Sequence, residues 1–230
     1  MKHMDYIYLN ENYYNNKKEI FTFLIDILKN HNTNDYSLLD LGCARGEFLY
    51  HIKKDLPKYS ELYGIDYSED LIKDAKRYEP LKGVSFRIGD AQNIEIEKKF
   101  DFITCLGLTG YFDSLDGLLS GINSCLKENG TALVFHLFNE FDVDVIVKYR
   151  NNKYFDTYEP GWNNHSIQTI KKNLNKVGLK LIKTHKFQLS IDALPKEDPA
   201  RSWTAYVGEN KKFINGLGLM FDLICLEISK

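Results

Sequence analysis

The first 140 residues alternate between short apolar runs and longer segments in which apolar residues recur every three or four positions. The short runs are typical of strands buried on both faces, and the longer spacing is typical of amphipathic helices. This order favours an α/β fold with an open, mostly parallel sheet covered by helices on both faces. The pattern predicts strands at 37–41, 61–66, 84–88, 100–106 and 131–137, and helices at 17–29, at 47–54, after Ser68 and at 114–127, the last ended by Gly130.

The second half of the chain departs from this rhythm. A helix is predicted at 166–177 and strands at 179–189 and near 219–228, with a polar, proline-containing insertion at 190–218 between the two strands. Because no internal repeat or low-complexity linker interrupts the chain, we expect a single domain over 1–230. Its expected parts are an N-terminal arm and helix at 1–35, a ligand-binding core at 36–137 and a second half at 138–230.

The overall composition is that of a soluble globular protein. Of the 230 residues, 43% are hydrophobic and 27% charged, and the formal net charge is −2. Affinity for nucleic acid depends largely on neutralised phosphates, so this charge argues against a nucleic-acid partner. No apolar run approaches the ~20 residues that span a bilayer, and no membrane partner is expected.

The cysteines indicate the compartment. Cys43, Cys105, Cys125 and Cys225 are scattered without a CxxC pair. Isolated cysteines in or beside buried strands are typical of free thiols rather than of a disulfide framework or a metal site. We therefore expect a cytoplasmic protein without a metal, and its oligomeric state stays open.

A glycine-rich turn follows the first predicted strand. The apolar run at 37–41 stops at Gly42-Cys43-Ala44-Arg45-Gly46, and a helix pattern starts directly at Glu47. Glycines in such a turn let the backbone bend and approach a ligand closely. Three later strands end on comparable features, namely Asp66, Asp90 and Leu106-Gly107. Because ligands bind at the carboxyl edge of an open parallel sheet, these residues together predict a binding site.

The acids and the glycine spacing point to a nucleoside. Asp66, 20 residues after Gly46, is placed to accept hydrogen bonds from both ribose hydroxyls. Asp90 and the backbone N–H of Ala91 are placed to bind adenine. A dinucleotide site prefers G-x-G-x-x-G, whereas this turn reads G-x-A-x-G and is followed by Glu47, which repels phosphate. S-adenosylmethionine fits this pattern better than a dinucleotide.

These segments resemble class I S-adenosylmethionine-dependent methyltransferases over roughly 36–137. Residues 38–46 resemble the first motif of that family, 62–68 its ribose-binding segment and 89–91 its adenine-side motif. Residues 100–105 and the turn at 126–130 also match. The resemblance implies a seven-stranded Rossmann-like sheet whose last strand is antiparallel, with S-adenosylmethionine as cofactor. It implies that the cofactor is bound by Asp40, Gly42, Cys43, Ala44, Gly46, Asp66, Tyr67, Asp90, Ala91 and Leu106.

Ala44 is a departure from the family, which usually has glycine at that position. Alanine has the smallest Cβ of the chiral residues, so we expect binding to survive if the backbone at Ala44 keeps a negative φ.

The residues that act on the methyl acceptor are less clearly marked. Displacement at an activated sulfonium carbon gains much of its rate from positioning, ~7–11 kcal/mol in favourable cases, and needs a base only if the acceptor must lose a proton. Candidate catalytic residues are His136, Tyr14 and Tyr111, with a structural role for His136 as the alternative. Candidates for binding the acceptor are Tyr13, His165, Arg201 and Trp203.

Two of these candidate groups have an alternative interpretation. Arg201 is suited to a phosphate or carboxylate and Trp203 to a pocket wall, but an Arg–Trp stack within a surface loop explains them equally well. The tyrosine-rich arm at 5–15 is either a lid that points Tyr13 or Tyr14 inward or an arm packed on the fold.

The predicted function is methyl transfer from S-adenosylmethionine to a nitrogen or oxygen of a small molecule, with a phosphorylated or sugar-derived metabolite as the candidate acceptor. The Asn-Pro-Pro-Tyr type tetrapeptide of many methyltransferases that act on base or glutamine amino groups is absent after residues 100–106. The alternatives are a non-catalytic module that binds the cofactor or its product S-adenosylhomocysteine, and a nicotinamide-dependent oxidoreductase, which the glycine spacing disfavours.

Overall fold

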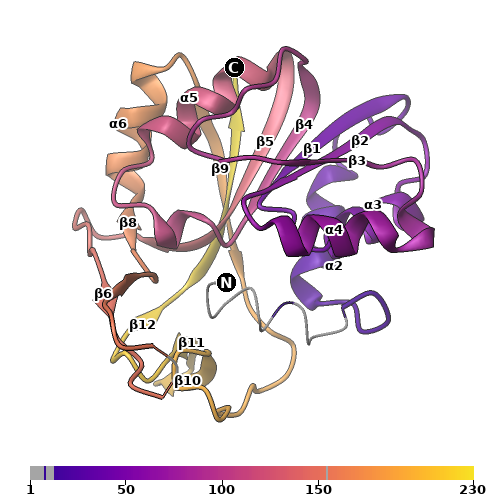
Figure 1. Cartoon of the computed structure of the whole chain (residues 1–230). Helices are drawn as coiled ribbons and strands as arrows, with labels where there is room; N and C mark the ends of the chain where they lie inside the picture. The colour runs from indigo at the N-terminus through magenta and orange to yellow at the C-terminus, as the bar shows by residue number, and fades with distance from the viewer. Residues whose placement is uncertain (1–7, 9–12, 154) are drawn as a thin grey trace.

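A computed structural model describes residue 8, residues 13–153 and residues 155–230, so most of the tyrosine-rich arm lies outside the described residues. An eight-stranded sheet runs through the described chain in the order β3-β2-β1-β4-β5-β13-β9, with the short β8 beside β5 (Figure 1). The strands are β1 (Tyr36–Leu41), β2 (Tyr59–Asp66), β3 (Ser85–Ile88), β4 (Phe100–Leu106), β5 (Leu126–Asn139), β8 (His165–Ser166), β9 (Lys180–Phe187) and β13 (Leu223–Ser229).

The strand directions confirm the predicted architecture. β1 pairs in parallel with β2 and β4, β2 pairs in parallel with β3, and β4 pairs in parallel with β5. β13, the last strand, is antiparallel to both of its neighbours, β5 and β9. The seven strands along the main path therefore form the predicted Rossmann-like sheet, whose parallel strands end at one shared edge.

Helices cover both faces of this sheet because successive residues of a strand point to opposite sides. Leu38 of β1 belongs to the core cluster that includes residues of α2 and α3, whereas the adjacent Leu39 belongs to the cluster that includes α5 and α6. None of the described helices is both long and apolar enough to cross a membrane. The helices are α2 (Glu19–Leu28), α3 (Glu47–Asp55), α4 (Glu69–Arg77), α5 (Asp116–Cys125) and α6 (Ile167–Lys176).

The boundary between α5 and β5 differs from the prediction. The helix expected at 114–127 ends at Cys125, and β5 begins at once with Leu126. Leu126 is fully buried and pairs with Phe100 at the start of β4. Strand pairing therefore outweighs the helical pattern from residue 126 onward. Gly130 therefore lies inside a strand and does not end the helix.

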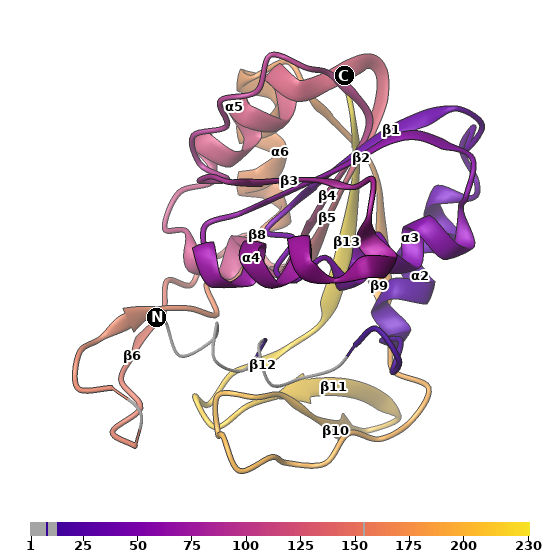
Figure 2. The same ribbon diagram turned by 45° about the vertical axis from the view of Figure 1, so that its right-hand side comes forward.

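The insertion forms a small sheet of its own beyond the carboxyl edge of the large sheet (Figures 1 and 2). Its antiparallel strands are β10 (Trp203–Val207), β11 (Asn210–Ile214) and β12 (Met220–Phe221). The segment expected as one last strand near 219–228 is divided, since Met220–Phe221 pairs with β11 while Leu223–Ser229 joins the large sheet. A second excursion, after β5, carries the short pair β6 (Lys148–Tyr149) and β7 (Glu159–Pro160).

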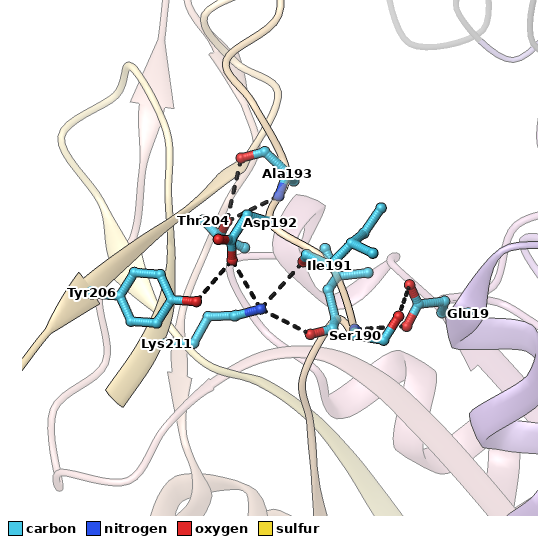
Figure 3. Close-up of polar contacts among 9 residues, drawn as sticks. Glu19, Ser190, Ile191, Asp192, Ala193, Thr204, Tyr206 and Lys211 are labelled. Carbon is cyan, nitrogen blue, oxygen red and sulfur yellow. Dashed lines mark hydrogen bonds and ion pairs between the residues drawn. The ribbon is translucent and has the colours of Figure 1, made fainter. Parts of the chain in front are cut away.

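Hydrogen bonds fasten the insertion to the start of α2 (Figure 3). Both carboxylate oxygens of Glu19 accept from Ser190, one from its backbone N–H at 2.8 Å and one from its hydroxyl at 2.9 Å. Lys211 of β11 donates to the carbonyl groups of Leu189 and Ile191 at 3.2 and 3.3 Å. We call the Glu19–Ser190 contact the latch. It joins segments 171 residues apart in the sequence.

Candidate active site

A cavity of about 400 Å³ opens at the carboxyl edge of the parallel strands. It extends from the end of β3, past β2 and β1, to the loop after β4, the same order in which these strands lie in the sheet. A volume of this size suits a small organic ligand. Among the residues predicted from the sequence, the lining includes Tyr13, Asp40, Gly42, Cys43, Ala44, Asp66, Tyr67, Asp90, Ala91, Leu106 and Tyr111.

The turn after β1 forms the floor of the cavity because its backbone is anchored to β2. The N–H groups of Gly42 and Cys43 both donate to the carbonyl of Ile65, at 2.8 and 2.9 Å. Gly42 has a φ of +72°, and a Cβ there would lie 2.7 Å from the side chain of Leu108. The position therefore requires glycine for its backbone conformation as well as for space.

Ala44 adopts a left-handed conformation, with a φ of +47°. The condition under which binding was expected to survive, a negative φ at Ala44, is therefore not met. Its backbone N–H donates to Oδ2 of Asp66 at 2.8 Å, and this hydrogen bond holds the turn in the form that a glycine would adopt more readily. Gly46, with a φ of +80°, comes directly before α3 and is not in contact with the cavity.

Asp66 and Asp90 are each oriented by local hydrogen bonds. Oδ1 of Asp66 accepts from the N–H of Ser68 at 2.9 Å, while Oδ2 accepts from Ala44. Oδ1 of Asp90 accepts from the N–H of Gln92 at 2.8 Å. An ionised carboxylate has about four acceptor positions, so each acid retains the capacity to bind hydroxyl or amino donors of a ligand.

Asp40 is a third acid on the cavity wall, and it is 2% exposed. Burial raises the pKa of the Asp40 carboxyl to about 7, although the hydroxyl of Thr104, which donates to Oδ1 at 2.7 Å, acts in the opposite direction. The neighbouring Asp66 and Glu47 raise it further. Because this pKa lies near neutral pH, a bound ligand can change whether the Asp40 carboxyl is ionised.

Sequence reasoning cited Glu47 only for its repulsion of phosphate, and it missed Lys18. Glu47 lines the cavity with a side chain that is 4% exposed, and burial raises its pKa. The ammonium group of Lys18 lies 3.6 Å from the centroid of the Tyr13 ring, and Lys18 also lines the cavity. The helix pattern at 17–29 placed Lys18 at the start of a helix, but only the tertiary structure places that helix end beside the turn.

His136 lies behind the loop that follows β4, outside the cavity lining. Its Nδ1 lies 3.1 Å from the hydroxyl of Thr109, and its ring stacks on Trp162 with centroids 6.2 Å apart. Burial, and then the neighbouring His165, lower the pKa of His136 to about 3. A direct role of His136 as the base stays a prediction, whereas its contacts support the short helical turn at Thr109–Tyr111.

Four other predicted residues lie outside the cavity lining. The hydroxyl of Tyr14 donates to the carbonyl of Arg45, and its ring stacks on Tyr78 with centroids 3.9 Å apart. His165 is 3% exposed, and its Nε2 lies 2.8 Å from the carbonyl of Phe112. Arg201 and Trp203 belong to the insertion, where Trp203 pairs with Ile214.

The fold, with its acid-lined cavity at the carboxyl edge of the parallel strands, defines an α/β protein of the Rossmann-like class. A sequence model described as a methyltransferase domain matches residues 11–184. The chain belongs to this family, within the class I S-adenosylmethionine-dependent methyltransferases.

Similar proteins of known sequence match parts of the chain. The malonyl-[acyl-carrier protein] O-methyltransferase of Bacillus cereus is 26% identical over 54% of this chain and 46% of its own. A dTDP-4-amino-2,3,4,6-tetradeoxy-D-glucose N,N-dimethyltransferase of Saccharopolyspora spinosa is 32% identical over 36% of this chain and 31% of its own. The chain thus spans half or less of the length of these relatives.

Solved structures share the fold over nearly the whole chain. An S-adenosylmethionine-dependent methyltransferase from Clostridium acetobutylicum superposes with a TM-score of 0.63 and 17% identity, covering 97% of this chain and 94% of the other. The glycopeptide N-methyltransferase MtfA, crystallised with S-adenosylmethionine, gives a TM-score of 0.58 and 11% identity over 91% of this chain and 93% of the other.

Proposed function

We propose that this protein transfers a methyl group from S-adenosylmethionine to a nitrogen or oxygen atom of a small molecule. The observation that carries the proposal is the cavity, which unites the glycine turn, Asp66 and Asp90 with a separate wall after β4. Family membership makes S-adenosylmethionine the cofactor to expect there. In the same proposal, the chain is a single cytoplasmic domain, in keeping with four cysteines that are all buried and free.

The lining residues fit this cofactor in the order in which they lie. Asp90 and the N–H of Ala91 are suited to adenine, Asp66 to the ribose hydroxyls, and the Gly42–Ala44 turn to the methionine part. The cofactor, when bound, supplies a methyl group on a positively charged sulfur. The contribution of the protein is to hold that methyl group in line with the acceptor and to keep water away.

The wall after β4 suits an acceptor that is already nucleophilic. It is made by Leu108, Phe112 and Pro160 together with the hydroxyl-bearing Tyr111. None of the described residues that line the cavity is a histidine, so the wall offers no imidazole to remove a proton. A carboxylate or an unprotonated amine reacts without any base, whereas an alcohol would have to give its proton to one of the cavity carboxylates or to Tyr111. We therefore favour carboxylic acids and amines as acceptors.

The names of the relatives include both kinds of acceptor, so they do not select between carboxylic acids and amines. One is named as an O-methyltransferase of a malonyl group and another as an N,N-dimethyltransferase of an amino sugar. The prediction of a phosphorylated acceptor depended on Arg201, and Arg201 lies outside the cavity lining. The proposal therefore rests on the cavity wall and not on the insertion.

The test is formation of S-adenosylhomocysteine by the purified full chain with S-adenosylmethionine and a panel of carboxylic acids, primary amines and alcohols. We expect turnover with members of the first two classes and none with simple alcohols. Binding of S-adenosylhomocysteine without turnover on any member would instead indicate the non-catalytic module. Turnover confined to alcohols would contradict the choice of acceptor.

A further inference from the structure

The wall after β4 joins two segments that lie far apart in the sequence. Leu108, Tyr111 and Phe112 belong to the loop between β4 and α5, whereas Pro160 is the last residue of β7. The loop carries only the short helical turn at Thr109–Tyr111, and β6 and β7 have two residues each. Elements this short supply few hydrogen bonds of their own, so contacts between the two segments fix the shape of the wall.

Asn163 makes such contacts in both directions. The residue is fully buried, and its backbone N–H donates to the carbonyl of Gly110 at 2.9 Å. Its side-chain Nδ2 donates to the carbonyl of Phe112 at 3.0 Å and to Oδ1 of Asp113 at 3.1 Å. Its Oδ1 accepts from the backbone N–H of Val147, directly before β6, at 2.7 Å. One buried amide therefore ties the loop after β4 to the excursion after β5.

The excursion side of this contact leads to the cavity. The carbonyl of Val147 accepts from the N–H of Gly161 at 3.3 Å, and Gly161 directly follows Pro160 of the cavity lining. The pairing of β6 with β7 closes the same short hairpin. A displaced Asn163 amide would therefore shift Phe112 and Pro160 relative to each other.

The partners of Asn163 require an amide at this position. The carbonyl of Phe112 and the carboxylate of Asp113 can only accept hydrogen bonds, whereas the N–H of Val147 can only donate one. A carboxylate of the same size would satisfy Val147 but would turn an oxygen toward two acceptors. His165 also supports the loop, since its Nε2 lies 2.8 Å from the Phe112 carbonyl. The polarity of the Asn163 side chain is thus matched to two separate segments.

We propose that Asn163 is a positioning residue for the methyl acceptor, because it fixes the loop that bears Tyr111 and Phe112 relative to Pro160. This inference rests on the proposed function and adds to it a residue that lies outside the cavity lining and acts through the wall. Asp66 and Asp90 are not among the hydrogen-bond partners of Asn163 described above. Affinity for the cofactor is therefore expected to be independent of this residue.

The test combines steady-state kinetics of the full chain, with an acceptor from the panel that the wild-type protein methylates, and titration calorimetry with S-adenosylhomocysteine. N163D keeps the size of the side chain and the contact with Val147 but loses the donor to Phe112 and Asp113. We expect kcat/KM for the acceptor to fall about 10- to 100-fold, with a rise in the acceptor KM, because a misplacement of about 1 Å can cost about 100-fold. The Kd of S-adenosylhomocysteine is expected to stay within about twofold of wild type.

A swapped pair supplies the matched control. D113N alone keeps an oxygen that accepts from Asn163 and loses only an exposed ion pair with Lys148 at 3.6 Å, so its kinetics are expected to stay close to wild type. In the double variant D113N/N163D, the introduced amide can donate to the introduced carboxylate. We expect this variant to regain about 3- to 10-fold of the kcat/KM that N163D loses.

N163S carries the test if N163D does not fold, since it removes the amide without adding a charge. An unchanged acceptor KM, a matching loss of S-adenosylhomocysteine affinity, or no recovery in D113N/N163D would overturn the inference and leave the proposed function intact. Failure of both N163D and N163S to fold would assign Asn163 a purely structural role and would also overturn the inference. Wild-type protein that methylates no member of the panel would overturn the proposed function itself.

Discussion

Ala44 is the residue of the binding turn whose backbone conformation is unfavourable for its side chain. It holds a φ of +47° through its hydrogen bond to Asp66, in a region that costs a chiral residue roughly 1–2 kcal/mol. Glycine pays no such penalty, although it loses more chain entropy on folding. The steric cost of a positive φ favours glycine at this position and the chain entropy favours alanine, and the steric cost is the larger of the two.

We therefore expect A44G to raise the free energy of unfolding by about 0.5–1 kcal/mol. Chemical denaturation followed by circular dichroism measures this change. The matched control is G46A, which introduces the opposite change at a φ of +80° and places a Cβ 2.9 Å from Leu81 and Phe86, so it is expected to destabilise the protein. A destabilised A44G variant would contradict the account of the turn.

Asp40 gives the stability of the free protein a specific pH dependence. Its pKa is about 7 in the folded protein and about 3.9 in an unfolded chain, so between these values the folded state keeps a proton that the unfolded state has released. Stability due to this group is therefore present at low pH and is lost as the pH rises toward 7.

D40N removes this ionisation and keeps an acceptor for Thr104. We expect the stability of D40N relative to wild type to increase by about 2–4 kcal/mol between pH 4 and pH 8, with the change complete just above pH 7. Urea unfolding at a series of pH values measures it. The comparison with wild type cancels groups that titrate in both proteins, and a difference that does not vary with pH would refute the raised pKa.

The latch is the feature of interest at the scale of elements. It connects the start of α2, next to Lys18, with the beginning of the insertion, and Lys211 braces the same segment (Figure 3). An exposed pair of hydrogen bonds contributes modestly to global stability. Its effect is expected to be local, because it holds the start of the insertion against α2.

We expect E19A to accelerate amide hydrogen exchange at 190–214 several-fold while β1 remains as protected as in wild type. Hydrogen exchange measured by mass spectrometry resolves these segments. D26A is the matched control in the same helix, since it removes only the exposed contact between Asp26 and Lys29 at 2.8 Å. Equal exchange in E19A and wild type would show that the insertion is held by other contacts.

Elements were predictable where local pattern and tertiary packing agree. The central parallel strands β1 and β4 follow from apolar runs, since a strand buried on both faces needs apolar residues throughout. The prediction failed where pairing partners decide the outcome. Leu126 leaves the helix because it pairs with Phe100, and Met220 leaves the last strand because it pairs with Ile214.

At the scale of the whole molecule, the acids that line the cavity were predictable, and the surroundings of several candidates for the acceptor side were not. Asp66 and Asp90 follow from topology, because every parallel strand ends at the same edge. The surroundings of Tyr14 and His165 depend on partners far along the chain, Arg45 and Phe112, which no local pattern reveals. Lys18 was missed for the same reason, because only the tertiary structure places it in the cavity lining.

The central claim is that this edge of the sheet binds S-adenosylmethionine through Asp66. Titration calorimetry with S-adenosylhomocysteine on wild type and D66A tests it most directly. We predict micromolar binding by wild type and a loss of about 10- to 100-fold in D66A, because that variant removes the charged acceptor for the ribose hydroxyls. Absence of binding to the wild-type protein, or equal affinity of the two proteins, would contradict the account.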